Sequence, residues 1–472
     1  MVCAAAVRLS TLGLQSFWYD EAFTPVHVLH PSLSATLSSL ASYEKTPPLW
    51  DIVIWAWSRV FGTGEIAMRL PSALAGIATV PVAWAIGREL GGRVAAGARR
   101  VPAFAAAVVA LNPLFVWYSQ EARAYALFVL LAALTTLCFL RADAQPTRRR
   151  TAAFVAAAAL TLLTHYFAVF LVAPMVVWLL RDRRRWPLTL PAAVTLAAVA
   201  AALVPLAVHQ EGHGLEWIGM WRLASRVITI PQYYLTGYSG APLGHTIEGL
   251  VALLILGSVA YGCRFAFTLA ERRGILLMVG LAACGIGVPV ALALVGADYL
   301  APRNVVAAMI PLTAAVAVAL ARPATGRAGL ALSALIVAAF AVLSVNVDLS
   351  PRVQRSDWRG IAQAIRSSAH SRRVITTVEL GSSPLEYYLP PLQNLHAGQQ
   401  VTVSEIDETG YPPLRSGAMD PPSPGFRLVA SVDIHGLILY RFTSAIPRTV
   451  SQATLLRHVI TSAHPEVLVR TR

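Results

Sequence analysis

Residues 187–208 read PLTLPAAVTLAAVAAALVPLAV, a run of 22 residues without a charge. An α-helix rises about 1.5 Å per residue, so this run reaches about 33 Å, which exceeds the roughly 30 Å hydrocarbon core of a bilayer. The whole chain has the same character, with 56% hydrophobic and 13% charged residues and a mean hydropathy of +0.60. Soluble proteins carry about 25% charged residues. The sequence therefore predicts an α-helical protein that crosses a membrane many times.

Ten other apolar segments bring the predicted number of spans to eleven. They cover residues 2–15, 71–87, 101–118, 122–140, 151–164, 166–180, 246–268, 274–297, 303–321 and 327–346. The first is short and has Arg8 at its centre. We therefore expect either a thin helix whose arginine reaches the interface, or a helix that starts upstream of Met1.

Arginines concentrate in alternate connectors, which gives the chain a sidedness. They lie at 88–100, 141–150, 181–185, 264–273 and 322–327. Short loops rich in arginine stay in the cytoplasm, so this pattern accounts for the net charge of +14 without a nucleic-acid partner. The opposite connectors are predicted to be extracytoplasmic. These are 16–70, 119–123, 165, 209–245, 298–302 and everything after about 347.

Residues 48–61 are apolar but short. If they crossed the membrane, the preceding loop would lie on the same side as the arginine-rich connectors. The segment contains Asp51 and Arg59, with tryptophans near its edges. Apolar segments of this length are more often interfacial than spanning, and tryptophan favours the headgroup level. We therefore expect 48–61 to lie on the outer surface, within an outer loop 16–70 that carries juxtamembrane helices.

The composition changes after Val347, which predicts a membrane domain over 1–346 and a small extracytoplasmic α/β domain over 347–472. A helix should start at Ser356-Asp357 and bury Trp358, Ile361, Ala362 and Ile365 on one face. Residues 374–380 and 428–442 should form strands, the second a hairpin around His435-Gly436, and 408–425 should be irregular.

Polar side chains gather in the connectors predicted to be extracytoplasmic, and charges near a membrane mark a candidate site. Carboxylates there can act as a general base or bind a metal, cations can hold a phosphate, and aromatic rings can stack on a sugar. Lys45 is the only lysine beside 37 arginines. Simpler interpretations exist for single members, since Asp20-Glu21 could be a loop acid or helix cap and Glu121 could pair with Arg123. The convergence on one face favours a site.

Four stretches together resemble a known family: WYDEAF (18–23), EKTPPL (44–49), FGTGEIAMRLPSALAG (61–76) and NPLFVWYSQEARAYAL (112–127). They resemble the bacterial family 39/83-like glycosyltransferases of the GT-C superfamily, a group that includes protein O-mannosyltransferases and lipid A aminoarabinose transferases. The resemblance covers the chain to about residue 346, and DWRG (357–360) also looks like the family's outer domain.

The resemblance implies a plasma-membrane transferase that takes a sugar from a polyprenyl-phosphate donor at the outer leaflet and passes it, with inversion, to a lipid, glycan or protein acceptor. Asp20 matches the family's catalytic base, and Glu21 would support it. The candidate phosphate ligands are Lys45, Arg69, Arg303 and Arg123. The candidate substrate contacts are Tyr19, Glu121, Tyr125 and His165. Glu44 matches a metal-binding position of the aminoarabinose transferases, so a divalent metal ion is the one cofactor to consider. Acceptor choice is expected to lie in loop 209–245 and the C-terminal domain.

The chain departs from the family pattern in three places. The first helix is shorter, the turn before Pro47-Pro48 reads Glu44-Lys45-Thr46 instead of a turn with histidine, and residues 298–303 align in more than one register. The last two departures bear on the phosphate ligands more than on the base.

Two alternatives to a transferase remain open. A transporter or flippase of lipid-linked glycans should place ionisable groups or broken helices near the bilayer midplane, often within inverted repeats. The polar residues lie at one face and no repeat is visible, which favours an enzyme. An inactive scaffold is the third hypothesis, against which the intact Asp20 argues.

Overall fold

The computed structural model describes residues 1–91, 99–211, 216–368, 373–461 and 465–470. These form two compact units. The first comprises Met1–Leu12 and His30–Leu349, and the second comprises Gly13–Leu29 and Ser350–Arg472. The boundary near residue 347 was expected, whereas nothing in the sequence indicated that Gly13–Leu29 would group with the C-terminal part.

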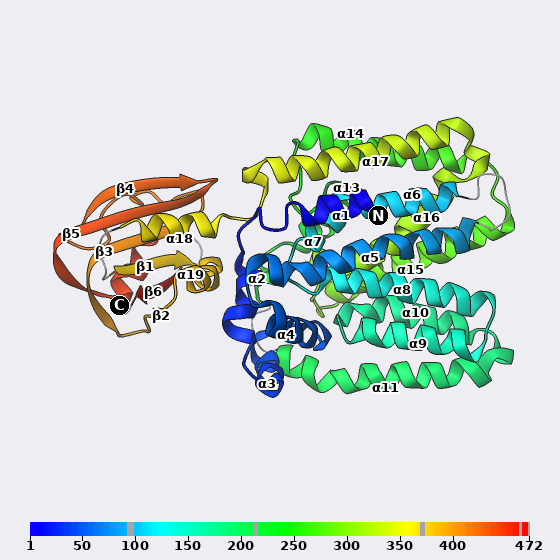
Figure 1. Cartoon of the computed structure of the whole chain (residues 1–472), viewed down its shortest axis with the longest axis horizontal. Helices are drawn as coiled ribbons and strands as arrows, with labels where there is room; N and C mark the ends of the chain where they lie inside the picture. The colour runs from blue at the N-terminus through cyan, green and yellow to red at the C-terminus, as the bar shows by residue number, and fades with distance from the viewer. Residues whose placement is uncertain (92–98, 212–215, 369–372, 462–464, 471–472) are drawn as a thin grey trace. The chain divides into compact units, whose positions relative to one another are not determined.

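Long apolar helices make up most of the first unit, where they run side by side (Figure 1). Seven helices of the described residues are long and apolar enough to cross a membrane. They are α5 (Glu65–Gly91), α8 (Tyr125–Ala144), α11 (Trp186–Glu211), α14 (His245–Cys263), α15 (Leu269–Leu294), η4–α16 (Pro302–Ala321) and α17 (Gly326–Leu349). The predicted mostly helical membrane fold is confirmed, while the count of eleven spans stays a prediction.

Four predicted spans are shorter or interrupted in the structure. Helix α1 covers Val2–Leu9, α9 covers Arg148–Leu162, and α10 covers Val169–Leu180. Helices α6 (Arg100–Leu111) and α7 (Pro113–Ser119) meet at an angle of 54° and would together make an eighth span.

Arg8 explains how the break between α6 and α7 is stabilised. Pro113 has no N–H, so the carbonyl of Val109 loses its helical donor. Arg8 donates from Nη2 to that carbonyl (2.9 Å), from Nη1 to the carbonyl of Ala110 (2.7 Å) and from Nε to Ser119 Oγ (2.9 Å). Its side chain is fully buried. Arg8 is therefore held inside the protein by two carbonyls at the break and by Ser119 at the end of α7, while its depth in the membrane stays a prediction.

The segment expected to be interfacial forms α4 (Leu49–Phe61), which is too short to cross a membrane. It packs on α3 (Leu33–Tyr43) and α5, and both short helices lie at one end of the long helices (Figure 1). Helix α13 (Leu223–Thr236) lies within the predicted outer connector 209–245.

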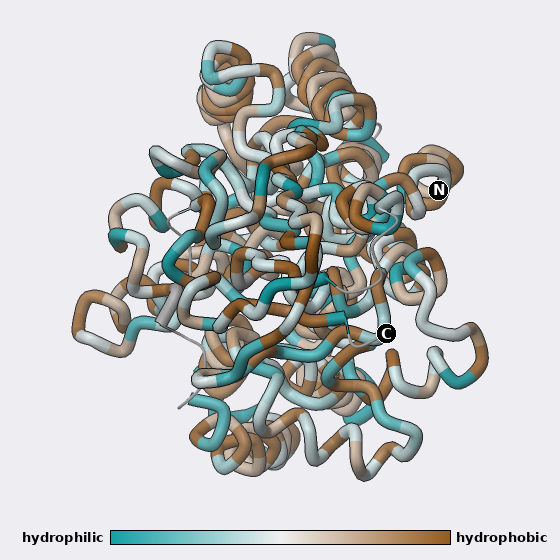
Figure 2. The backbone as a smooth tube through the Cα atoms, turned by 90° about the vertical axis from the view of Figure 1, so that its left-hand side faces the viewer, coloured by the Kyte–Doolittle hydropathy of each residue, from teal (hydrophilic) through white to brown (hydrophobic). Residues whose placement is uncertain are grey.

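The second unit contains a mixed sheet of six strands in the order β2-β6-β1-β3-β5-β4. The strands are β1 (Arg373–Val378), β2 (Leu392–Asn394), β3 (Gln400–Gly410), β4 (Arg427–Ile434), β5 (Leu437–Ser451) and β6 (Pro465–Arg470). Among these described strands, β1 and β3 pair in parallel and the other pairings are antiparallel. Exposed and partly buried residues alternate along β4. Figure 2 shows hydrophilic and hydrophobic residues interleaved along the backbone of the chain. The mixed sheet, together with the helices of this unit, confirms the predicted α/β class.

The predicted helix and hairpin of this unit are confirmed, whereas β1 ends at Val378 instead of residue 380, and β3 extends to Gly410, into the segment expected to be irregular. Helix α18 (Trp358–Arg366) starts after Asp357, whose side chain accepts from the Gly360 N–H, and it buries the predicted apolar face. Strands β4 and β5 join through His435-Gly436, both with positive φ, as a two-residue hairpin turn requires. Helices α19 (Ser382–Tyr388) and α20 (Gln452–Arg457) complete the unit, and no strand of the described residues covers 411–425, the rest of the segment expected to be irregular.

Candidate active site

The motif at 112–127 forms one corner of the candidate site in the first unit. Asn112 caps α7 by accepting from the Leu114 N–H (3.0 Å), and α7 ends at Ser119. A tight turn follows before α8 begins at Tyr125. The turn places Glu121 and Arg123 at the start of a long membrane helix, with Glu121 buried.

Arg123 makes a two-pronged ion pair with Glu44. Its Nη1 and Nη2 donate to Glu44 Oε1 (2.8 Å) and Oε2 (2.9 Å). The Glu44 carboxylate is nearly fully buried, and such paired contacts are among the strongest that a carboxylate can make. The pair joins two motifs that lie 79 residues apart.

Asp51 of α4 is a second buried carboxyl group, and sequence reasoning did not select it for the site. Neither of its oxygens has a hydrogen-bond partner among the described residues. Burial first, and then the negative charge of Glu44, raise the pKa of Asp51 well above its usual value, while Arg123 opposes the shift. Burial therefore favours the protonated form of Asp51. Its only sequence signal was an acid within an apolar helix.

His165, Tyr125 and Arg303 lie together. The rings of Tyr125 and His165 are 6.1 Å apart, and the guanidinium carbon of Arg303 is 6.0 Å from the centre of the Tyr125 ring. Phe128 stacks on His165 at 4.6 Å. Burial, followed by the positive charges of Arg303 and Arg123, lowers the pKa of His165 to about 3.

The neutral His165 ring has a defined tautomer. Its Nδ1 accepts from the Phe167 N–H at 3.2 Å, so the ring proton is on Nε2. His165 can therefore donate a hydrogen bond without carrying a charge. This places three predicted site residues, His165, Tyr125 and Arg303, around one point of the structure.

Lys45 is held by a neighbour that the sequence did not identify. Its Nζ donates to the carbonyl of Gln210 at 3.0 Å. The buried Gln210 amide donates to the Leu40 carbonyl (3.1 Å), and its oxygen accepts from the hydroxyl of Tyr166 (2.8 Å). Gln210 thus fixes the end of α3 and the turn with Lys45 against the end of α11.

Arg69 is buried in α5 and donates from Nη1 to the carbonyl of Leu12 at 3.0 Å. The segment before Arg303 is fixed by Arg226 of α13. Arg226 donates to both oxygens of Asp298, at 2.7 and 2.5 Å, and to the carbonyl of Leu300 at 2.7 Å. Hydrogen bonding to Arg226 lowers the pKa of Asp298. Arg226 therefore positions the segment that directly precedes Arg303, a role that one sequence could not reveal.

The remaining predicted residues belong to the second unit. Glu21 is fully buried, and its carboxylate lies 3.8 Å from the guanidinium of Arg355. Asp20 is partly exposed in the same short helix, α2 (Tyr19–Phe23), where the ring of Tyr19 lies 5.7 Å from that of Phe23.

The WYDEAF and DWRG segments contact one another within this unit. Ser16 Oγ donates to the carbonyl of Ser356 (2.9 Å) and accepts from the Trp358 N–H (3.0 Å). Ser16 and Ser356 are 340 residues apart in sequence.

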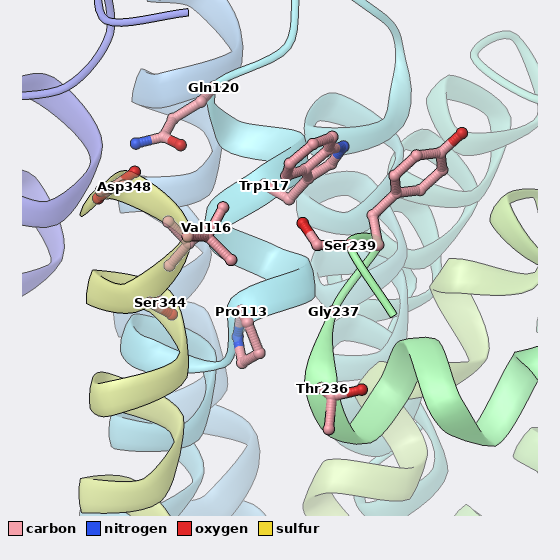
Figure 3. A pocket seen from close by; sticks show the side chains of 11 residues that line it. Pro113, Val116, Trp117, Gln120, Thr236, Gly237, Ser239, Ser344 and Asp348 are labelled. Atoms are coloured by element: carbon pink, nitrogen blue, oxygen red, sulfur yellow. The ribbon is translucent and has the colours of Figure 1, made fainter. Parts of the chain in front are cut away.

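A pocket of about 260 Å³, including space open to solvent, lies between α7, α17 and the turn after α13 (Figure 3). Its lining includes Trp117, Gln120, Tyr238, Ser239 and Asp348. The rings of Trp117 and Tyr238 are stacked 5.1 Å apart. The pocket therefore combines an aromatic wall with amide, hydroxyl and carboxylate groups.

The arrangement around Glu44 does not fit a metal site. Both of its oxygens accept from Arg123, and the described residues contain no group of three or more histidine, cysteine, aspartate or glutamate side chains that could hold a metal ion. Glu44 as a metal ligand stays a prediction, and no step below passes through a metal.

The model of the family described as dolichyl-phosphate-mannose-protein mannosyltransferase matches residues 45–209. Two crystal structures of ArnT from Cupriavidus metallidurans match over 93% of this chain and 96% of theirs, each with a TM-score of 0.53. One was bound to undecaprenyl phosphate and is 13% identical, and the other is an apo state and is 14% identical. No curated protein sequence matches the chain.

The chain has the GT-C fold. The resemblance that the four motifs indicated is therefore confirmed at the level of the fold. The matched region contains Lys45, Arg69, Glu121, Arg123 and His165. Asp20 and Arg303 lie outside it, and their roles in this GT-C chain stay predictions.

Proposed function

We propose that this GT-C chain transfers a sugar from a polyprenyl-phosphate donor to an acceptor at the extracytoplasmic face of the membrane, with inversion at the sugar. The observation that carries the proposal is the grouping of Arg123, Arg303, Glu44 and His165 where outer connectors meet the long helices. A lipid phosphate requires cations at the level of the headgroups.

Helix α8 supports the proposed orientation. It begins at Tyr125, in the candidate site, and Asp143 near its other end contacts Arg181, Arg185 and Arg273. Eighteen helical steps separate the two residues, or about 27 Å, close to the thickness of a hydrocarbon core. This length supports a placement of the site and of the arginine-rich end at opposite faces of the membrane. If the arginines are cytoplasmic, as their bias favours, the site is extracytoplasmic.

The proposed reaction needs a base more than an acid. Asp20 would remove the proton of an acceptor hydroxyl as that oxygen attacks the anomeric carbon. The bond to the lipid phosphate would break on the opposite side of the sugar. Because the leaving group is already an anion, cations stabilise it without protonation. His165, neutral at physiological pH, would donate a hydrogen bond from Nε2 to the donor.

Among the proposed phosphate ligands, Arg303 and Lys45 are suited to direct contact. Nη1 and Nη2 of Arg123 both donate to the Glu44 carboxylate, so they are already used within the protein. Arg123 would then act by its charge, and Arg69, buried in α5, by holding the surrounding backbone. The pocket beside Tyr238 and Ser239 is our candidate for acceptor contacts, since both residues lie in loop 209–245.

The base is tested with Asp20→Asn in reconstituted vesicles, using radiolabelled polyprenyl-phosphate mannose as the first donor. We expect transfer to fall by about a thousandfold or more, because a general base and its alignment are lost together. Asp420→Asn, an exposed aspartate of the same unit, is the matched control and should keep full activity. Full activity in Asp20→Asn would overturn the assignment of the base.

Binding of the lipid phosphate is tested separately from catalysis. Undecaprenyl phosphate should raise the melting temperature of the wild-type protein and of Asp20→Asn in detergent, because it binds the folded state. Arg303→Gln should lose most of that shift. A shift retained in full by Arg303→Gln would remove Arg303 from the phosphate site.

The broken span α6–α7 and the buried Arg8 are the features that would favour a transporter. Their bonding argues for a structural role, because the Arg8 donors are used on the carbonyls of Val109 and Ala110 and on Ser119. A transporter would move lipid-linked sugar across vesicles without forming a glycosylated product, which the transfer assay distinguishes.

A further inference from the structure

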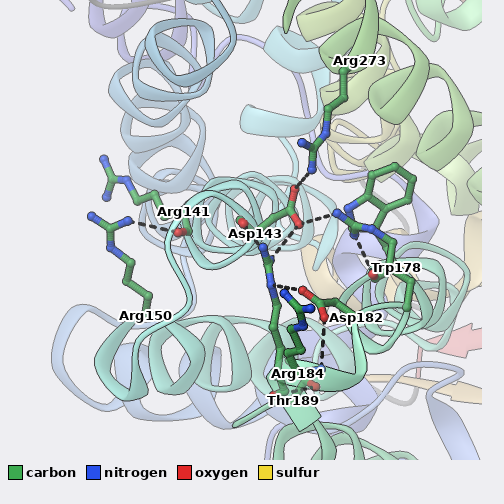
Figure 4. A network of polar contacts seen from close by, with 10 residues as sticks. Arg141, Asp143, Arg150, Trp178, Asp182, Arg184, Thr189 and Arg273 are labelled. Atoms are coloured by element: carbon green, nitrogen blue, oxygen red, sulfur yellow. Dashed lines mark hydrogen bonds and ion pairs between the residues drawn. The ribbon is translucent and has the colours of Figure 1, made fainter.

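One buried carboxylate holds three arginines at the end of the helix bundle opposite the candidate site. Asp143 near the end of α8 accepts from Arg181 Nη2 (2.9 Å), Arg185 Nη1 (3.4 Å) and Arg273 Nη2 (2.9 Å) (Figure 4). The arginines come from the turn between α10 and α11 and from the first turns of α15. We call these four residues the Asp143 cluster.

The Asp143 cluster is a fixed structure rather than a set of loose charged loops. Arg185 also donates to the carbonyl of Asp143 (2.9 Å) and pairs with Asp182 (2.9 Å), and Arg181 donates to the carbonyl of Trp178 (2.6 Å). Orientation in a membrane requires only a bias in charge between loops. A network that fixes the guanidinium groups in space goes beyond that requirement.

Positive charge exceeds negative charge around the cluster. Seven arginines lie in the cluster or in the turns and helix ends beside it, and three carboxylates lie among them. The arginines are Arg141, Arg150, Arg181, Arg183, Arg184, Arg185 and Arg273, and the carboxylates are Asp143, Asp182 and Glu89. Four positive charges therefore have no carboxylate of their own within this set.

The surplus charge is accessible. The side chain of Arg273 is 58% exposed and that of Arg181 is 37% exposed, although both contact Asp143. A guanidinium has five N–H donors in a rigid fork that matches a phosphate, and the shared carboxylate uses only some of them. The remaining donors are available for an anion.

Two tryptophans place the cluster at the level of lipid headgroups. The guanidinium carbon of Arg181 is 4.0 Å from the centre of the Trp178 ring. Trp186 donates from its indole N–H to the Leu180 carbonyl and is 41% exposed at the start of α11. Tryptophan is enriched where a bilayer meets water, which supports a position of these arginines at the depth of lipid phosphates.

We propose that the Asp143 cluster is a binding site for the phosphate of an anionic phospholipid such as phosphatidylglycerol. Basic pockets between membrane helices bind anionic headgroups by the same chemistry. The acyl chains would lie along the apolar faces of α10 and α11. The proposal is independent of the proposed transferase activity.

The test measures binding of phosphatidylglycerol and of phosphatidylcholine to the purified full chain by native mass spectrometry. We expect the Arg181→Lys/Arg273→Lys variant, which keeps every charge and the topology, to bind phosphatidylglycerol several-fold more weakly because the forked donors are lost. Arg181→Gln/Arg273→Gln should weaken it by about tenfold or more.

The matched control removes equal charge elsewhere on the same predicted face. Arg99→Gln/Arg100→Gln should change phosphatidylglycerol binding by less than about twofold, since these arginines lie outside the cluster. Equal loss in this control, or equal binding of the two lipids by the wild type, would overturn the proposal. Complete displacement of the lipid by millimolar inorganic phosphate would also overturn it, because the site would then be a simple anion site.

Discussion

Asp51, a single acidic residue in an apolar helix, links the stability of the chain to pH. The group is buried next to the Glu44–Arg123 pair, and its folded-state pKa is well above the ordinary 3.8. The folded chain therefore holds a proton that the unfolded chain releases. Stability then falls as pH rises from about 4 towards the raised pKa, by up to about 1.4 kcal/mol per pH unit.

Asp51→Asn, which is neutral at every pH, should remove this contribution. We expect the melting temperature of the variant to fall less steeply than that of the wild type as the pH rises above the ordinary pKa of an aspartate, about 4. Differential scanning fluorimetry in detergent measures the slope. Asp420→Asn, an exposed control, should keep the wild-type slope, and parallel curves for Asp51→Asn and wild type would contradict the assignment.

The ion pair between Glu44 and Arg123 should contribute to the stability of the folded chain. Glu44→Gln leaves a mostly buried guanidinium without its carboxylate, which should cost about 3 kcal/mol. Adding Arg123→Gln should recover part of that loss, because no uncompensated charge remains. Melting temperatures of the two single variants and the double variant give the coupling. Strictly additive losses would show that the two side chains do not stabilise one another.

At the scale of elements, the break between α6 and α7 depends on a residue from another helix. Arg8→Met removes the donors to two backbone carbonyls and to Ser119, so we expect a loss of about 2–4 kcal/mol. In a Pro113→Ala background the loss should be smaller, because that substitution restores an N–H for the Val109 carbonyl. Thermal unfolding measures both effects. An equal loss in the two backgrounds would contradict the link between Arg8 and the break.

Patterns of hydropathy predicted the long helices, the face of α18 and the hairpin at His435-Gly436, because each depends on residues that are close in the sequence. The bonding of Arg8 was missed, since its acceptors lie 101 to 111 residues away. The hydrogen bonds of Arg226 to Asp298 and of Gln210 to Leu40 were missed for the same reason, because the partners are far apart in the sequence. The four motifs located the candidate site, but spacing alone could not say which cation pairs with which acid.

At the scale of the molecule, the proposed topology assigns opposite faces to α4 and to the turn between α10 and α11. Val60→Cys and Arg184→Cys, each in a background without native cysteines, place a thiol at an exposed position of either element. A membrane-impermeant maleimide added outside intact cells should label Val60→Cys at once, and Arg184→Cys only after permeabilisation. Labelling of both from one side would show that α4 does not lie on the outer surface.

Helix α8 carries Tyr125 at one end and Asp143 near the other, with about 27 Å between them. A helix does not stretch, so both ends sit at their proper depth only in a bilayer of matching hydrophobic thickness. Thicker membranes would submerge one end, and thinner ones would force the helix to tilt. Reconstitution in lipids of graded acyl length should give an optimum for transfer at intermediate length, where both ends of α8 lie at their proper depth.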